Sequence, residues 1–264
     1  VCDGILTNKK KFLEETAQNF QSLSQGGPEN SFGVFRSSES CLWKAVDLLD
    51  DRAATVPTSQ SSATALFTSL SVPLALFHKK WSKTLASQCL DLARTFSSHP
   101  LEVVGTVLNG FLVTRFLNLQ GGELISQSKE ILQEALEICS QAEIEYQNRI
   151  NVFEDEETEK VKNAFSQTLE GLIPQLEKSE KEALQWIVGN AADYTKREIR
   201  HASQGFILTL IPLALYLVFS RESKFSLASV FEQGRETEKL GALTGAWLGA
   251  VYGVQAIAEN LKTG

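Results

Sequence analysis

The feature that most constrains this chain is a series of glycines spaced four residues apart between residues 241 and 253. They are Gly241, Gly245, Gly249 and Gly253, and an alanine follows each of the first three. Residues four apart lie on the same face of a helix, so these small residues would form one smooth ridge. Each glycine inside a helix costs about 1 kcal/mol relative to alanine. We therefore expect another helix, most simply that of residues 206–219, to pack closely against the ridge.

Two other interpretations of this segment are compatible with its spacing. In one, the N-terminus of the helix, which carries Glu236 and Glu238, lines a functional site. In the other, the helix crosses a membrane, because residues 240–258 form an uncharged run of 19 residues with the small-xxx-small pattern of membrane interfaces. Glycine and alanine make this run only weakly apolar, so we expect no membrane span.

Four segments resemble motifs of the ADP-ribosylglycohydrolase family, in the family's order. Residues 234–253 resemble the last motif, Asp-x-Asp-Thr/Ser-x-Gly-Ala with further Gly-Ala pairs, and residues 205–216 resemble the preceding helix with its Pro-Leu-Ala-Leu-Tyr core. Residues 73–77 are similar to the helix after the family's Asn-Gly loop, and residues 95–100 to its Thr-His-x-x-Pro turn. The resemblance implies an all-α fold, an orthogonal multi-helix bundle, and hydrolysis of ADP-ribose linkages with a pair of magnesium ions.

The positions that would hold magnesium depart from the family pattern. Both Asp and the Thr of the last motif are metal ligands in the family, and the resemblance places Glu236, Glu238 and Lys239 there. Mg²⁺ requires near-ideal octahedral geometry with oxygen ligands at about 2.0 to 2.1 Å. Two longer carboxylates and an ammonium group disturb every one of these contacts. We therefore expect a degenerate metal site, no bound metal or other cofactor, and no catalytic residue at these positions.

Two further family motifs are incomplete. Residues 65–70, where the Asn-Gly loop would lie, have no glycine for close approach to a diphosphate and no arginine. The first motif, Thr-Asp-Asp-Thr, has residues 1–4 as its nearest counterpart, with Asp3 as the only aspartate. The resemblance therefore implies the scaffold of the family without its chemistry.

Lys239 has two possible placements. A vacant metal site would leave two carboxylates close together, and their repulsion would raise one pKa or splay the start of the helix. In the first placement, Lys239 pairs with Glu236, Glu238 or a more distant acidic residue and takes over part of the metal's electrostatic role. In the second, it points into solvent from the first helical turn, where a cation is mildly unfavourable against the helix dipole.

Charge and cysteine content exclude several classes of function. The formal net charge of −7 argues against nonspecific nucleic-acid binding, which needs a basic surface. The cysteines, Cys2, Cys41, Cys89 and Cys139, form no CxxC pair and suggest free thiols in a reducing compartment.

No apolar secretory segment lies at the start of the sequence, so we expect a cytoplasmic protein. The histidines, His78, His99 and His201, are expected to cap helices or lie at the surface.

Hydrophobic periodicity predicts helices throughout, and residues 1–264 are expected to form one domain with a divergent middle segment of about 120–200. The clearest amphipathic helix covers residues 124–153. Its apolar stripe consists of Leu124, Ser128, Ile131, Ala135, Ile138, Ala142 and Tyr146. Such a helix would be about 45 Å long. We expect its stripe near Ile138 and Tyr146 to be covered by the helix of residues 180–200, or to bind a protein partner or a second copy of the chain.

Three functions are compatible with these observations. The first is a family relative that has lost catalysis and acts as a binding or scaffold protein. The second is an active Mg²⁺-dependent hydrolase that removes ADP-ribose from a protein side chain, with Glu236 and Glu238 as substitute ligands. The third is a structural module without a ligand. We favour the first, because the matched positions hold neither a complete ligand set nor an isolated carboxylate that could activate water.

Overall fold

The computed structural model describes residues 11–25, 63–120, 122–149, 159–220 and 228–256, and every regular element in these ranges is a helix. The all-α class predicted from the sequence is confirmed. The α-helices are α2 (Phe12–Gln25), α4 (Ser71–His78), α5 (Lys83–Phe96), α6 (Pro100–Leu117), α7 (Ser128–Arg149), α9 (Ala164–Leu172), α10 (Glu180–Ala192), α11 (Ile207–Ser220), α12 (Ala228–Glu232) and α13 (Thr237–Tyr252). Short 3-10 helices are η2 (Thr68–Leu70), η3 (Ile173–Glu177) and η4 (Gly253–Ala256).

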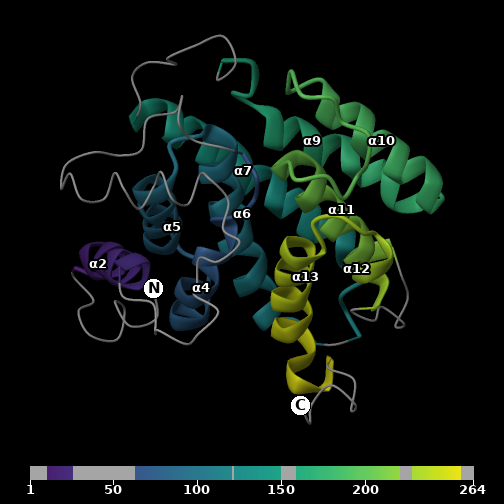
Figure 1. The fold of residues 1–264 in the computed structure, drawn as a ribbon. Coiled ribbons are helices and arrows are strands. Elements are labelled where there is room, and N and C mark those ends of the chain that lie inside the picture. Colours follow the sequence, from purple (N-terminus) through teal and green to yellow (C-terminus); the bar gives the residue numbers. More distant parts are fainter. Residues whose placement is uncertain (1–10, 26–62, 121, 150–158, 221–227, 257–264) are drawn as a thin grey trace.

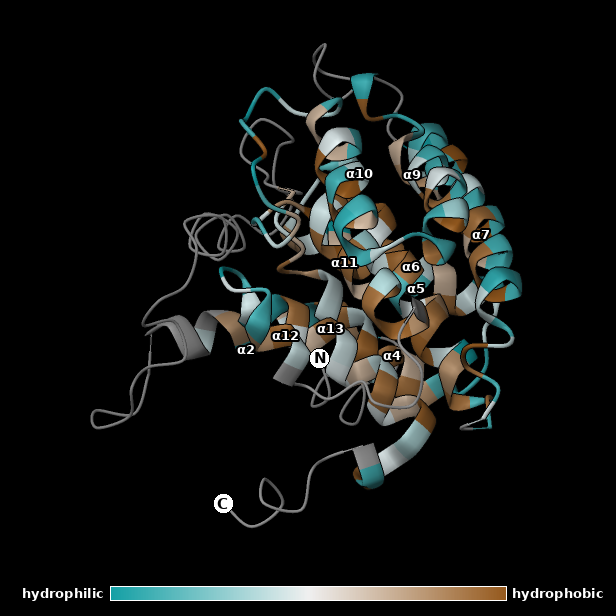
Figure 2. Cartoon of the chain, turned by 90° about the vertical axis from the view of Figure 1, so that its right-hand side faces the viewer, coloured by the Kyte–Doolittle hydropathy of each residue, from teal (hydrophilic) through white to brown (hydrophobic). Residues whose placement is uncertain are grey.

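Helix α6 occupies the centre of the fold, in contact with α4, α5, α7, α9, α11 and α13 (Figure 1). Its residues from Pro100 to Thr114 are all buried. Figure 2 shows the polar surfaces of α7 and α10 on the outside of the molecule. Within the described residues, α6 is the one helix long and apolar enough to cross a membrane, and 89% of it is buried inside the fold. Its apolar composition is therefore explained by its position in the core of the fold.

Local sequence signals set the starts of three helices. Pro73 is the third residue of α4, so this helix begins just before the proline, where the missing N–H costs no hydrogen bond. The Ser82 hydroxyl accepts the N–H of Leu85 at 3.2 Å and caps α5. His99 caps α6, because its Nδ1 accepts the N–H of Leu101 at 3.2 Å. The capping role expected for His99 is confirmed.

Helix α7 is shorter than predicted and is covered differently. It begins at Ser128 and has 22 residues to Arg149, while residues 150–158 lie outside the described part of the chain. Its buried face packs against α5, α6 and α9. The expectation that residues 180–200 cover this face is wrong, because α10 packs against α11 and η3. The Glu143 carboxylate gives the physical reason: it accepts the N–H of Phe165 at 2.9 Å and so holds the start of α9 on α7.

The glycine ridge of α13 is not the buried face of the helix, so the predicted ridge packing against residues 206–219 is wrong. Gly249 is exposed, and apart from its chain neighbours and the backbone of its own helix no described atom lies within 4 Å of a Cβ atom built on it. A Cβ atom at Gly241 would meet only a methyl group of Val230, at 3.9 Å. The side of α13 that packs against α6 and α11 instead contains the buried residues Leu240, Leu243, Thr244, Trp247 and Leu248. Burial of these larger side chains stabilises the fold far more than burial of glycine, and this decides the orientation.

Candidate functional site

The residues of the last motif lie where the loop before α11 meets the start of α13. Glu236 precedes the first residue of α13, and its N–H donates to the carbonyl of Ser203 at 3.4 Å. The Ser203 hydroxyl donates to the carbonyl of Gln233 at 2.8 Å. Each of the two segments, the loop before α11 and the loop before α13, thus donates one hydrogen bond to the other. These bonds place Glu236 next to residues 203–205.

Lys239 and Glu236 form an ion pair at this junction. The Lys239 ammonium lies 2.9 Å from Oε2 of Glu236, and the two side chains are 8% and 31% exposed. Residues three apart in a helix share a face, so the first turn of α13 brings the two groups together. The prediction that Lys239 pairs with an acidic residue is confirmed. The alternative, a lysine that points into solvent, is wrong.

Gly205 provides the space for the Glu236 carboxylate. A Cβ atom built at Gly205 would lie 2.8 Å from Oε1 of Glu236 and 3.1 Å from its Cδ. Any larger residue at this position would push the carboxylate away from its present place. The glycine of the penultimate family motif therefore has a steric role in the ion pair of the last motif.

A second junction joins α11 to the segment before α4. The N–H of Ile207 donates to the carbonyl of Ala63 at 2.8 Å. The carboxylate of Glu102, a fully buried residue in the first turn of α6, accepts the N–H groups of Ala65 at 3.0 Å and Phe67 at 2.7 Å. The starts of α6 and α11 are therefore both tied to residues 63–67, which overlap residues 65–70, where the Asn-Gly loop would lie.

The backbone of this segment has an unusual conformation at Ala65, which has a φ of 63°. This left-handed region favours glycine and asparagine over other residues. The two N–H groups bound by Glu102 hold Ala65 in this conformation. The segment thus holds a left-handed conformation at a residue that is not glycine.

Comparison with known protein families identifies the chain. A family model described as ADP-ribosylglycohydrolase matches residues 1–264. The chain belongs to the ADP-ribosylglycohydrolase family. The resemblance drawn from four motifs is therefore confirmed. A search of curated proteins and a search of solved structures found no match.

The three positions of the last ADP-ribosylglycohydrolase motif have different environments in this chain. Glu236 is paired, Lys239 is buried, and Glu238 is exposed. Residues two apart on a helix do not face each other, so Glu238 does not join the pair formed by Glu236 and Lys239. Among the described residues, no three His, Cys, Asp or Glu side chains are grouped so that they could hold a metal ion. The nearest counterpart of the first motif, residues 1–4, lies outside the described residues.

Two polar core residues of this family member were missed by sequence reasoning. Glu102 and Asn109 are both fully buried in α6. The signal that could have identified them is their position in a helix that is otherwise almost entirely apolar, because a buried polar side chain needs hydrogen-bond partners. Both side chains bind the segment that leads into α4.

Cys89 and Cys139 are free and buried, and burial raises the pKa of both thiols. Cys2 and Cys41 lie outside the described residues. His78 Nε2 lies 2.6 Å from Oε1 of Gln88, and His201 is exposed. Raised thiol pKa values disfavour the reactive thiolate, so neither described cysteine is a candidate nucleophile.

Proposed function

We propose that this member of the ADP-ribosylglycohydrolase family has lost hydrolysis and acts as a binding or scaffold protein. The observation that carries the proposal is the 2.9 Å ion pair between Lys239 and Glu236. An ammonium group and a magnesium ion compete for the same carboxylate. The ammonium group of the buried Lys239 has the advantage that the chain itself holds it beside Glu236. The described residues at the last motif therefore do not fit a pair of magnesium ions, and we derive no reaction step through them.

The ion pair with Lys239 gives the Glu236 carboxylate a positive partner without a bound metal ion. Desolvation of a carboxylate is costly unless a positive charge or hydrogen bonds compensate it. Lys239 provides this charge from the first turn of α13, and Gly205 leaves space for the carboxylate that it binds. The scaffold is thereby kept intact although the ligand pattern of the last motif is lost.

A titration with ADP-ribose, with and without Mg²⁺, tests the proposal. If catalysis is lost, millimolar Mg²⁺ leaves the melting temperature unchanged, and the protein releases no ADP-ribose from a modified protein substrate. Binding of ADP-ribose without Mg²⁺ would then indicate a binding protein, whereas no binding at all would favour a scaffold. A clear rise in melting temperature with Mg²⁺, together with release of ADP-ribose, would instead establish the Mg²⁺-dependent hydrolase.

A matched variant separates these outcomes. Lys239→Thr restores the residue type that the family uses as a ligand and removes the internal cation. The proposal expects this variant to respond to Mg²⁺ more strongly than the natural chain, because Glu236 is then free to bind the ion. An equal response of the two proteins would show that Lys239 does not determine metal binding.

We also propose that any protein partner or second copy of the chain binds the part of residues 124–153 that the fold leaves accessible. Among the described residues of this range, Ile125 and Ile144 are the exposed large apolar side chains, at 38% and 58%. Measurement of the molecular mass in solution for the natural chain and for Ile144→Lys tests self-association. A mass above that of one chain, reduced by the substitution, is the expected result.

A further inference from the structure

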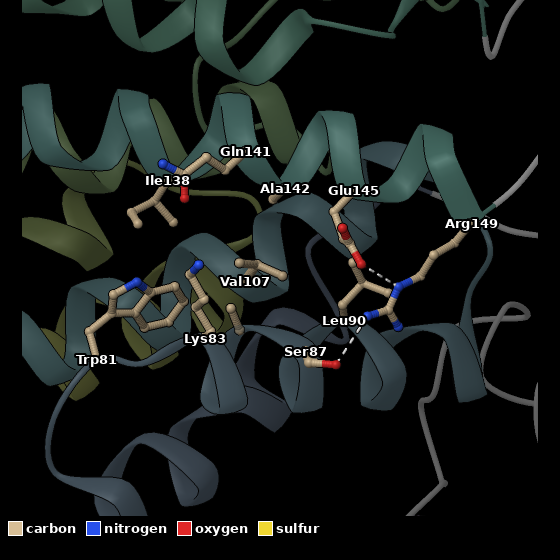
Figure 3. A pocket seen from close by; sticks show the side chains of 11 residues that line it. Trp81, Lys83, Ser87, Leu90, Val107, Ile138, Gln141, Ala142, Glu145 and Arg149 are labelled. Atoms are coloured by element: carbon tan, nitrogen blue, oxygen red, sulfur yellow. Dashed lines mark hydrogen bonds and ion pairs between the residues drawn. The ribbon is translucent and has the colours of Figure 1, made fainter.

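A pocket of about 350 Å³ opens between α5 and α7, away from the last motif (Figure 3). This volume lies within the range of small-molecule sites, roughly 300 to 1,000 Å³. The walls are mainly apolar and are formed by Trp81, Leu90, Val107, Ile138 and Ala142. None of the lining residues belongs to α13 or to the loop before α11, so the pocket is separate from Glu236 and Lys239.

One end of the pocket is polar and internally compensated. The Arg149 guanidinium lies 2.6 Å from Oδ1 of Asp91 and 2.8 Å from Oε1 of Glu145, and it donates to the hydroxyl of Ser87 at 3.0 Å. Figure 3 shows the bonds to Glu145 and Ser87. Two carboxylates thus balance Arg149, and this end of the pocket does not favour a further anion.

The positive charge that is not balanced in this way belongs to Lys83. Its side chain lines the pocket, and Figure 3 shows its nitrogen directed from α5 toward α7 beside Trp81. Lys83 takes part in none of the ion pairs formed among the described residues, although the chain carries a net charge of −7. The pocket therefore combines apolar walls with one available cation.

We infer that this pocket binds a small monocarboxylate with an aromatic or medium-chain aliphatic body. The apolar body removes the surfaces of Trp81 and Ile138 from water, which is the main source of affinity. The carboxylate lies beside the Lys83 ammonium and forms a charge-assisted hydrogen bond with it. A second negative charge on the ligand would approach Glu145, so the pocket favours a single carboxylate over a diphosphate.

Calorimetric titration of the full chain with octanoate tests this inference, with 1-octanol as the uncharged probe. We expect octanoate to bind at one site. Lys83→Gln should weaken octanoate binding by about fivefold, the effect of one partly exposed ion pair, and leave 1-octanol binding unchanged. Lys181→Gln is the matched control, because Lys181 is an exposed lysine on α10 outside the pocket, and it should change neither titration.

A second variant tests the apolar part of the site. Ala86→Phe places an aromatic ring in the pocket from α5 and should abolish binding of both probes while circular dichroism shows a folded protein. If this variant does not fold, the comparison of Lys83→Gln with Lys181→Gln decides alone. Absence of saturable octanoate binding, equal weakening by the two lysine variants, or undiminished binding to folded Ala86→Phe would each overturn the inference. Binding of ADP-ribose that depends on Lys83 would also overturn it, because the ligand class would then be a nucleotide.

Discussion

Trp247 and Asn109 join α13 to the central helix of the fold: the indole Nε1 donates a 2.8 Å hydrogen bond to Oδ1 of Asn109. The other end of the amide donates to the carbonyl of Thr68 at 2.9 Å and to the hydroxyl of Ser71 at 3.0 Å. Both Trp247 and Asn109 are fully buried. One amide thus connects α13, α6 and the start of α4, elements that are far apart in the sequence.

Asn109→Leu should lower the free energy of unfolding by about 1 to 3 kcal/mol. The substitution keeps a similar volume but leaves the buried Trp247 N–H without its acceptor, and one unpaired buried group costs about this much. The Thr68 carbonyl still accepts the Ser71 hydroxyl at 2.8 Å. Denaturant unfolding of both proteins measures the difference.

A double-mutant cycle with Trp247→Phe provides the control for this prediction. Phenylalanine has no N–H, so Asn109→Leu should cost at least about 1 kcal/mol less in the Trp247→Phe background. Strictly additive effects would show that the hydrogen bond contributes nothing to stability.

Lys239→Met should lower the free energy of unfolding by about 1 kcal/mol or more, because methionine keeps the apolar stem but leaves the Glu236 carboxylate without its cation. Glu236→Gln in the Lys239→Met background should recover part of this loss, since it removes the uncompensated charge. Thermal and denaturant unfolding measure both changes. A Lys239→Met protein as stable as the natural chain would argue against an energetic role of the pair.

Gly205→Ala should have an effect similar to loss of that ion pair. The added methyl group would lie 2.8 Å from Oε1 of Glu236, and the flexible carboxylate can move away only by leaving its present position near Lys239. In the Lys239→Met background the same substitution should cost less, because no pair remains to be broken. Equal costs in the two backgrounds would separate Gly205 from the ion pair.

Gly249→Ala should stabilise the protein by about 0.5 to 1 kcal/mol. Alanine has the higher helix propensity, and no described atom lies within 4 Å of the added methyl group. Gly105→Ala is the contrasting variant, because its methyl group would lie 2.6 Å from Cδ1 of Ile207 and should destabilise the core. Destabilisation by Gly249→Ala would mean that the ridge of α13 is packed after all.

Glu143 should give the protein a measurable pH dependence of stability. Burial raises the pKa of Glu143, although hydrogen bonds from Ser166 and Phe165 partly offset this effect. A raised pKa in the folded state means that the contribution of this group to stability declines as the pH rises through that pKa. Glu143→Gln keeps an acceptor for the Phe165 N–H but does not ionise.

The difference in free energy of unfolding between Glu143→Gln and the natural chain should therefore shift in favour of the variant as the pH rises from below the ordinary glutamate pKa through the raised pKa of Glu143. Denaturant unfolding across this range measures the shift. Glu143→Ala, which removes the acceptor, should be destabilised at every pH, because the start of α9 loses the hydrogen bonds of its partner. A pH-independent difference for Glu143→Gln would contradict the burial argument.

The sequence by itself determined the helical class, several helix boundaries and the family. Pro73, Ser82 and His99 act through hydrogen bonds and sterics within a few residues of the chain, so their effects on helix starts are visible in the sequence. The spacing of Glu236 and Lys239 likewise indicated that they could meet, because residues three apart share a helix face.

Only the tertiary structure decided which face of α13 is buried, what covers α7 and how deeply Lys239 lies. The glycine pattern indicated that the glycine face of α13 is buried. Trp247 instead turns the other face of α13 into the core, where it binds Asn109, 138 residues away in the sequence. Burial depends on which distant residues fill the space around a helix, and a local pattern carries no information about that. For the same reason, the sequence did not show which distant backbone N–H groups the buried carboxylates of Glu102 and Glu143 bind.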